Sequence, residues 1–292
     1  MKNLTGIIPP VLTAFNADRS LNLDGTKAFI RHLIDKGVHG IFVAGSTGEY
    51  TLLSVEERKE LIAAGVEAAD GKVPLLAGTG HNSTAITMEL SQYAEKVGAD
   101  AVVVSLPHYP RPTEEGLYEH YKRIAHEVSI PVFVYNWPDA MGYSISPKMV
   151  AQLAADGLIA GIKDSHANLD HALEIRRLTE VKITVFAGWA SKLLPALVLG
   201  LDGIVATAAN AIPEEIVAIY DLFQAGNIEN ARQTHYKILP FINAMMEDPD
   251  GIKEAVRLLG HNVGPSRLPI VKSSLEVTEH VRDSLRKLGK LS

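Results

Sequence analysis

Eight short apolar runs recur along this chain at a nearly regular spacing, and no other feature limits the fold as strongly. Several runs, such as residues 101–104, are almost continuously apolar and β-branched, which is typical of strands covered on both faces of a parallel sheet. Successive runs start about 28 residues apart on average, which suits a strand, a crossover helix and two loops. The sequence therefore predicts eight βα repeats, with strands in residues 6–15, 40–46, 73–79, 101–107, 131–136, 158–164, 182–188 and 203–210.

The segments between these runs carry signals for the start and the end of helices. Ser54 and Glu57 form a capping-box pattern, Ser83 is placed to cap the next helix, and Ser146 precedes a proline at a first helical position. Glycines stand where helices should end, at Gly37, Gly98, Gly157 and Gly200. Eight such repeats predict a closed (β/α)8 TIM barrel. The alternative is an open doubly wound sheet, but no Gly-x-Gly-x-x-Gly sequence follows the first run.

After about residue 225 the sequence predicts helices and no further strands. The expected helices cover residues 227–246, 251–260 and 273–288, and Ser273 with Glu276 forms another capping-box pattern. We therefore divide the chain into a barrel that carries the active site, residues 1–225, and a C-terminal helical extension, residues 226–292.

Composition limits the function classes. The chain has no cysteine, which excludes disulfides, thiolate metal sites and cysteine nucleophiles. Its net charge of −6 argues against nucleic acid or an anionic membrane as the main partner. No apolar run approaches the ~20 residues of a membrane span, and the first residues lack the core of a signal peptide. We expect a cytoplasmic protein and, because the possible metal ligands are scattered, no metal and no organic cofactor.

Lys163 is the most informative single residue, because it lies at the end of the apolar run 158–164. Lysine is almost never fully buried unless it is paired or used. Burial in apolar surroundings lowers the pKa of an amine, and a neutral amine is a nucleophile for a carbonyl carbon. Lys163 therefore predicts imine chemistry. The structural alternative is an ion pair with Asp164 or another neighbour at the strand end.

Other polar residues follow the same ends of the predicted strands, where the active site of such a barrel lies. Ser46 and Thr47 follow the second strand beside Gly45, and Tyr135 lies near the end of the fifth. Hydroxyls and exposed backbone N–H groups can hold a carboxylate, and a tyrosine can move a proton to and from a reacting oxygen. Together with Lys163 they predict a site that makes or breaks a carbon–carbon bond next to an imine.

Each of these residues also has a purely structural interpretation. Tyr135 could be a rim residue with a satisfied hydroxyl, and residues 45–48 could be only a turn. For Glu49 we favour a helix cap, and for His81 and His108 plain loop positions. These interpretations weaken jointly, because all of the polar residues fall on one end of one predicted barrel.

Four ordered motifs resemble the dihydrodipicolinate synthase and N-acetylneuraminate lyase family, which comprises class I aldolases that handle pyruvate on a (β/α)8 barrel. They are Gly-Ser-Thr-Gly-Glu at 45–49, Pro-His-Tyr at 107–109, Tyr-Asn-x-Pro at 135–138 and Gly-Ile-Lys-Asp at 161–164, and the resemblance runs nearly end to end. It implies that Lys163 forms the imine with pyruvate or another 2-oxo acid and that Tyr135 is the central acid and base.

The resemblance also implies further roles and a homotetramer built as a dimer of dimers. Thr47 would relay a proton to Tyr135, and Tyr109 matches the tyrosine that family members insert into a neighbouring subunit's site. The implied substrate-binding positions are Gly45, Ser46, Thr47, Ala140, Gly188 and Val205.

Departures from the family pattern bear on the second substrate. The synthases carry an arginine two residues after the proline of Tyr-Asn-x-Pro, where this chain has Ala140, and alanine cannot clamp a carboxylate. Sialic acid lyases carry an acidic residue soon after the glycine that ends the seventh strand. Here Gly188 is followed by Trp189-Ala190-Ser191, so that acid is missing.

The chain most resembles the branch that cleaves 2-keto-3-deoxy sugar acids. Our principal prediction is therefore reversible cleavage of such an acid to pyruvate and an aldehyde. A hydroxyl-rich tail needs hydrogen-bond partners, for which Ser46, His81, Tyr143 and Ser165 are candidates, although Trp189 indicates a partly apolar pocket.

Four other activities remain open. Three are enzymes of the same family: dihydrodipicolinate synthase, N-acetylneuraminate lyase, and a dehydratase or hydratase-aldolase for a 2-oxo acid. The fourth is a sensor that binds a 2-oxo acid without catalysis.

Overall fold

Each predicted apolar run contains one short strand, and the strands are almost entirely buried because helices cover their outer face. The computed structural model describes residues 4–292. Residues 1–3, which belong to the segment that we expect not to be a signal peptide, lie outside the described residues. The strands are β1 (Gly6–Ile8), β2 (Ile41–Val43), β3 (Leu75–Gly78), β4 (Ala101–Ser105), β5 (Val132–Asn136), β6 (Gly161–Asp164), β7 (Thr184–Ala187) and β8 (Gly203–Val205).

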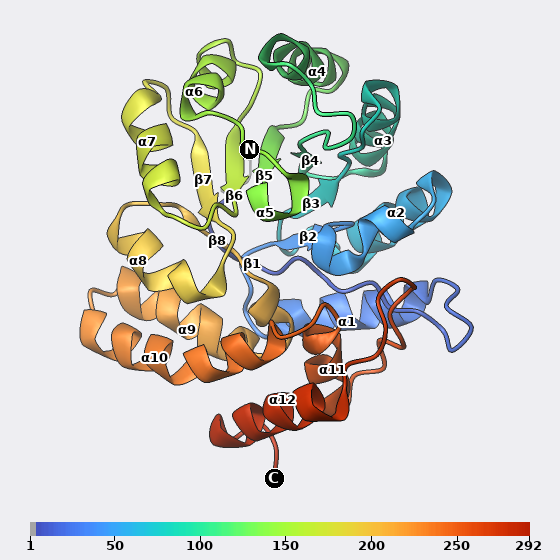
Figure 1. Ribbon diagram of the computed structural model, residues 1–292, viewed down its shortest axis with the longest axis vertical. Coiled ribbons are helices and arrows are strands. Elements are labelled where there is room, and N and C mark those ends of the chain that lie inside the picture. Colours follow the sequence, from blue (N-terminus) through green and yellow to red (C-terminus); the bar gives the residue numbers. More distant parts are fainter. Residues whose placement is uncertain (1–3) are drawn as a thin grey trace.

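All recorded strand pairs are parallel, and the sheet closes on itself. Each strand from β2 to β7 pairs with the next along the chain, and β8 pairs with β1. Between β1 and β2 the closure is a parallel bridge of Pro10 with Phe42, with the Val11 amide donating to the Phe42 carbonyl at 2.8 Å. The predicted (β/α)8 barrel is thus confirmed, and the open doubly wound alternative is wrong (Figure 1).

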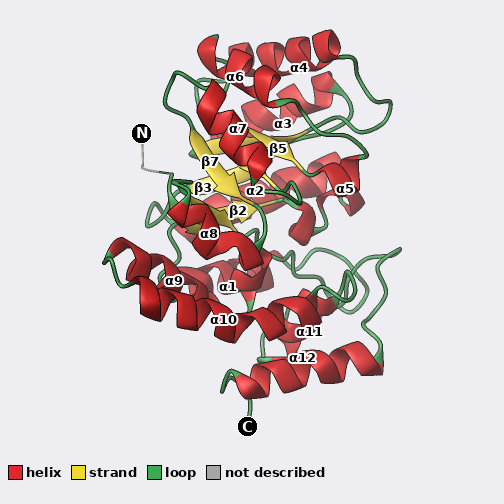
Figure 2. Cartoon of the chain, turned by 60° about the vertical axis from the view of Figure 1, so that its left-hand side comes forward, coloured by secondary structure: helices red, strands yellow, loops and turns green. Residues whose placement is uncertain are grey.

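Helices surround the strands, as Figures 1 and 2 show. The barrel helices are α1 (Leu23–Asp35), α2 (Val55–Ala69), α3 (Thr84–Val97), α4 (Glu114–Glu127), α5 (Pro138–Met141), α6 (Pro147–Ala155), α7 (Asp170–Leu178), α8 (Leu193–Val198) and α9 (Pro213–Gln224). Short 3₁₀ helices follow three of the strands: η1 (Ser46–Gly48) follows β2, η3 (Ala190–Lys192) follows β7 and η4 (Thr207–Asn210) follows β8. A fourth, η2 (Tyr50–Leu52), follows η1.

Most of the predicted helix signals act as expected. Ser54 and Glu57 form the capping box, and the Ser146 hydroxyl accepts from the amide of Met149. The four helix-ending glycines all have a left-handed backbone, which glycine adopts without strain. Ser83 occupies the N-cap of α3, but its side chain makes no capping bond, so that part of the prediction is wrong.

The C-terminal extension consists of α10 (Ile228–Met245), α11 (Gly251–Leu258) and α12 (Leu275–Lys287), which lie together on one side of the barrel (Figures 1 and 2). Buried residues of α10, such as Ile238 and Phe241, belong to the same apolar core as the strands. The predicted capping box at Ser273 is wrong, because Ser274 caps α12 and the Ser273 hydroxyl binds Asp248 at 2.9 Å. None of the helices within residues 4–292 is long and apolar enough to cross a membrane.

Candidate active site

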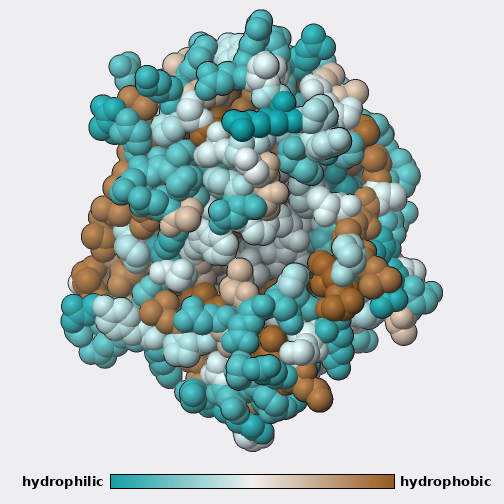
Figure 3. Space-filling model, viewed as in Figure 1, coloured by the Kyte–Doolittle hydropathy of each residue, from teal (hydrophilic) through white to brown (hydrophobic). Residues whose placement is uncertain are grey.

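A pocket of about 440 Å³ lies at the C-terminal ends of the strands. Figure 3 shows a hollow near the centre of this face of the molecule. Loops after the strands supply most of its lining, and the extension closes one side. The lining residues from the barrel include Ser46, Thr47, His108, Tyr135, Trp137, Ala140, Lys163, Ser165, Gly188, Trp189 and Thr207.

Lys163 projects from β6 into this pocket and is only 5% exposed. Its Nζ lies 3.8 Å from the ring centre of Tyr135 and 5.4 Å from that of Phe42. Within residues 4–292 it makes no ion pair, and the neighbouring Asp164 binds other residues, so the structural alternative of a Lys163–Asp164 pair is wrong. Burial lowers the pKa of Lys163 to about 7, which leaves much of the amine neutral at neutral pH.

Tyr135 is the register partner of Lys163 on the adjacent strand β5. The Ser46 hydroxyl donates to its phenol oxygen at 3.3 Å. Burial raises the pKa of Tyr135, against the opposing effect of this hydrogen bond, so the phenol keeps its proton at neutral pH. A buried phenol of this kind can act as a base only if it passes its own proton on. Ser46 can take that proton once its hydroxyl rotates from donor to acceptor.

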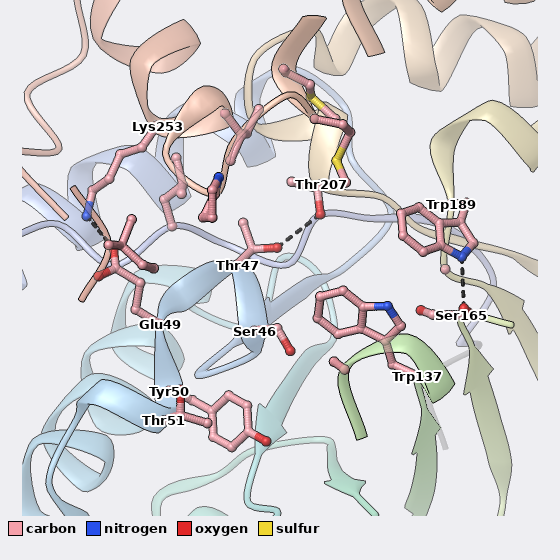
Figure 4. A pocket seen from close by; sticks show the side chains of 18 of the residues that line it. Ser46, Thr47, Glu49, Tyr50, Thr51, Trp137, Ser165, Trp189, Thr207 and Lys253 are labelled. Atoms are coloured by element: carbon pink, nitrogen blue, oxygen red, sulfur yellow. Dashed lines mark hydrogen bonds and ion pairs between the residues drawn. The ribbon is translucent and has the colours of Figure 1, made fainter. Parts of the chain in front are cut away.

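Ser46 and Thr47 both lie on η1, directly after β2, but their hydroxyls have different partners (Figure 4). Thr47 Oγ1 lies 3.0 Å from Thr207 Oγ1 of η4. The hydroxyl that contacts Tyr135 is therefore that of Ser46, and not that of Thr47 as we expected. Sequence reasoning did not assign a role to Thr207, because an isolated threonine at a strand end carries no distinctive pattern.

The other predicted positions divide into two groups. Gly188 and Ala140 line the pocket, and a side chain at Gly188 would collide with the Ser165 hydroxyl. Val205 and Gly45 do not line it, although Ser46 and Thr207, which are close to them in the chain, do. Tyr109 is 79% exposed and is not among the residues that line this pocket.

The residues proposed for a hydroxyl-rich tail also divide. Ser46 and Ser165 line the pocket, whereas His81 and Tyr143 do not. The Tyr143 hydroxyl donates to the carbonyl of Pro107 at 2.7 Å, and His81 Nδ1 accepts from the amide of Ser83. His108 lines the pocket, although we expected a plain loop position for it.

Glu49 stands at the N-cap of η2, but its side chain makes no capping hydrogen bond, so our preferred interpretation of that side chain is wrong. Its carboxylate binds Lys253 Nζ of α11 at 2.7 Å and accepts from the amide of Arg267 at 2.8 Å (Figure 4). Both charged side chains are almost completely buried. The ion pair thus fastens the C-terminal extension to the turn that carries Ser46 and Thr47.

The outer wall of the pocket is largely apolar. The Trp189 indole donates to the carbonyl of Ser165 at 2.8 Å and meets Trp137 edge-to-face at 6.3 Å. The facing residues come from the extension and its following loop: Ile242, Met245, Met246, Ile252 and Ile270. Sequence reasoning missed all five, because their apolar spacing looks like ordinary helix packing.

Charged groups in the lining are few. Lys163 and Lys253 are its only lysines or arginines, and Glu49 neutralises Lys253. Beyond the Lys163 region, the described lining therefore offers no unpaired cation to a ligand's second carboxylate. In the same part of the chain, no three histidine or carboxylate side chains gather closely enough to hold a metal ion.

Comparison with known proteins gives a consistent result. Residues 3–288 match the sequence profile of the Dihydrodipicolinate synthetase family. A 4-hydroxy-tetrahydrodipicolinate synthase from Methanospirillum hungatei is 38% identical over 285 residues, which cover 96% of this chain and 98% of the relative. One from Methanocaldococcus jannaschii is 36% identical over 287 residues, which cover 97% and 98%.

Solved structures agree at the level of the backbone. A dihydrodipicolinate synthase superposes with a TM-score of 0.95 at 35% identity, covering 99% of this chain and all of that one. YagE, a prophage protein from E. coli K12 that belongs to the dihydrodipicolinic acid synthase family, was solved in complex with pyruvate. It superposes with a TM-score of 0.94 at 34% identity, covering 98% of this chain and 99% of that one.

Proposed function

We propose that Lys163 is the residue through which this chain binds pyruvate, because the chain belongs to the Dihydrodipicolinate synthetase family. The chain is a class I carbon–carbon lyase of the aldolase type, in which pyruvate forms a Schiff base with the enzyme. Lys163 is the buried lysine in the pocket whose amine has no ion-pair partner in residues 4–292, and this observation carries the assignment.

The reaction follows from the groups around Lys163. The neutral amine adds to the C2 carbonyl of a 2-oxo acid, and loss of water leaves the imine. In the cleavage direction the C3–C4 bond breaks, its electron pair moves onto the imine as an enamine, and the C4 carbon leaves as an aldehyde. A proton then returns to C3, and water hydrolyses the imine to release pyruvate.

Tyr135 and Ser46 provide the proton path in this scheme. The C4 hydroxyl gives its proton to Tyr135 as the aldehyde forms, the phenol proton passes to Ser46, and Ser46 releases its own hydroxyl proton to the next member of the relay. Thr47, held by Thr207, binds the substrate carboxylate together with the backbone of η1. The exposed Tyr109 completes the relay from a neighbouring subunit in a homotetramer, and we place the enzyme in the cytoplasm.

For the second substrate we propose an aldehyde without a charge, as in the cleavage of a 2-keto-3-deoxy sugar acid. Two observations support this. Ala140 lines the pocket at the position where an arginine would be needed to bind a second carboxylate, and the described lining has no free cation other than Lys163. Ser165 and Ser46 offer hydrogen bonds to hydroxyls on the tail, and Trp137 and Trp189 offer apolar surface.

The alternative is 4-hydroxy-tetrahydrodipicolinate synthase, in which pyruvate condenses with aspartate semialdehyde. The names of the curated relatives favour this activity over our principal prediction. It would require the carboxylate of the aldehyde to bind without an arginine at position 140.

A comparative assay separates these activities. Pyruvate release is measured from 2-keto-3-deoxy sugar acids, sialic acid and aromatic 2-oxo acids, and condensation is measured with pyruvate and aspartate semialdehyde. We expect the largest kcat/KM for a 2-keto-3-deoxy sugar acid. A larger kcat/KM with aspartate semialdehyde would make the chain a synthase, and consumption of a sugar acid without pyruvate release would make it a dehydratase.

A further inference from the structure

Two polar residues lie directly behind the proposed catalytic pair. Tyr135 and Lys163 are register partners on β5 and β6, and the following residues, Asn136 and Asp164, are partners as well. Because successive side chains of a strand point to opposite faces, Asn136 and Asp164 point away from the pocket, and neither lines it. The Asn136 amide donates to Asp164 Oδ1 at 2.8 Å.

His171 of α7 is the second partner of Asp164. Its Nδ1 lies 3.0 Å from Asp164 Oδ2, and its Nε2 lies 2.9 Å from the carbonyl oxygen of Ile145. A carbonyl oxygen only accepts, so Nε2 must carry a hydrogen. The other contact also needs a proton, because a bare ring nitrogen and a carboxylate oxygen would face each other with lone pairs only. One proton therefore lies between Nδ1 and Oδ2, and the raised pKa of His171 favours its place on the ring, which makes the contact an imidazolium–carboxylate pair.

The charges around this pair leave Asp164 as the counterion of His171. His166 stacks on the His171 ring with centres 4.7 Å apart. Lys192 donates to the carbonyl oxygens of His166 and Ala167, and its charge also attracts Asp164, but only His171 of these two cations makes direct contact with that carboxylate. The remaining charged groups of α7 bind elsewhere: Asp170 to Asn168, Glu174 to Arg177, and Arg176 to Asp202. From α6, Lys148 acts on Glu174.

Electrostatics agree with this geometry. Burial lowers the pKa of His171, but the hydrogen bond and charge of Asp164, with the Ile145 carbonyl, outweigh that effect and leave the pKa raised. Asp164 is itself buried, so its carboxylate would be costly without a partner.

We propose that His171 is a positioning residue that holds Asp164 in a neutral ion pair directly behind Lys163. The proposal rests on the proposed role of Lys163 as the imine nucleophile. An unneutralised carboxylate one residue away would favour the ammonium form of Lys163 and so lower the fraction of neutral, nucleophilic amine. The positive charge of the His171 imidazolium offsets the negative charge of Asp164. The hydrogen bonds from His171 to Asp164 and from Asn136 to Asp164 also connect the ends of β6 and β5 beside the two catalytic side chains.

The test is the pH profile of imine formation with pyruvate, measured as the rate of borohydride trapping. Asn at position 171 can still donate to Asp164 but carries no charge. We expect His171→Asn to move the acidic limb of the profile to higher pH by roughly one unit, which is about a tenfold loss below the limb, with recovery on the alkaline plateau. The double variant His171→Asn/Asp164→Asn removes both charges and should return the limb to the wild-type position.

A uniform loss of rate at every pH, with the limb unmoved, would show that His171 only supports the fold and would overturn the proposal. A measurement on the wild-type protein does not depend on the variants folding. The ¹⁵N chemical shifts of His171 should report two protonated ring nitrogens at pH 7; a neutral ring at that pH would also overturn the proposal. Failure of the wild type to trap pyruvate at any pH would instead refute the role of Lys163.

Discussion

Lys253 and Glu49 form a buried ion pair, 2.7 Å from Nζ to Oε1, in the lining of the active-site pocket. Lys253 belongs to the C-terminal extension, and Glu49 directly follows η1, which carries Ser46 and Thr47. Each partner has a second contact, since Lys253 also donates to the Pro265 carbonyl at 3.1 Å and Glu49 accepts from the Arg267 amide. Both charges are therefore compensated, and the extension is a structural part of the active site.

Removal of one partner should be costly. Lys253→Met leaves the Glu49 carboxylate buried without its cation, so we expect the free energy of unfolding to fall by about 3–5 kcal/mol. Urea unfolding at neutral pH measures this. The control is the double variant Lys253→Met/Glu49→Leu, which removes both charges and should recover most of the loss. A single variant within about 0.5 kcal/mol of wild type would mean that the pair is not closed in solution.

Lys163 should reduce stability in a pH-dependent way. Burial lowers its pKa to about 7 from the 10.5 of an ordinary lysine. Between these values the unfolded chain binds a proton that the folded chain lacks, so this contribution to stability rises with pH; below about pH 7 the cost of burial is constant. Lys163→Met should therefore abolish turnover and yet be more stable than wild type by a few kcal/mol at pH 7.

Urea unfolding of both proteins at several pH values checks this. The advantage of the methionine variant should shrink steadily towards pH 10. An advantage that stays constant across the range would show that the amine is not held with a lowered pKa.

Local features of the sequence were sufficient to predict the barrel. Each strand lies within a predicted run, because a strand buried on both faces must be apolar along its length. The position of Lys163 at a strand end predicted imine chemistry, which agrees with the family of the chain, while the role of Lys163 itself stays a prediction. What could not be predicted depends on contacts between distant segments.

Glu49 and Lys253 illustrate this limit. They are far apart in the chain, and nothing near Glu49 indicates a buried partner, so a helix cap was the simpler interpretation. Ser46 and Thr47 illustrate a second limit. Both carry a hydroxyl, and only the 3₁₀ turn of η1 decides which one meets Tyr135 and which one meets Thr207.

This arrangement of hydroxyls predicts different defects for neighbouring substitutions. Ser46→Ala removes the hydroxyl that donates to Tyr135 and relays its proton, so we expect kcat to fall by about 10²-fold or more, with a smaller change in KM. Thr47→Val removes a carboxylate ligand and should mainly raise the KM for the 2-oxo acid. Steady-state kinetics in the cleavage direction compare the two, with Thr207→Val as the control that frees Thr47 without deleting it.

A reversal, with Thr47→Val losing kcat and Ser46→Ala losing only affinity, would restore the relay through Thr47 that the family resemblance implied. Equal losses in both variants would indicate that the turn itself had collapsed, which the near-ultraviolet circular dichroism of each variant would reveal.

Ala140 offers a gain-of-function test of the second substrate. Ala140→Arg places a guanidinium in the pocket lining. In the described lining of the wild type, Lys163 is the only cation without an ion-pair partner. A charge-assisted hydrogen bond is worth about 1.5–3 kcal/mol, so kcat/KM for aspartate semialdehyde should rise roughly tenfold to hundredfold. Ala140→Met adds similar bulk without charge and should give no rise in kcat/KM for aspartate semialdehyde.

Both variants should lose activity towards an uncharged aldehyde, because both fill the same space. If Ala140→Arg gained no more than Ala140→Met, position 140 would not face the aldehyde carboxylate, and the choice between lyase and synthase could not depend on it.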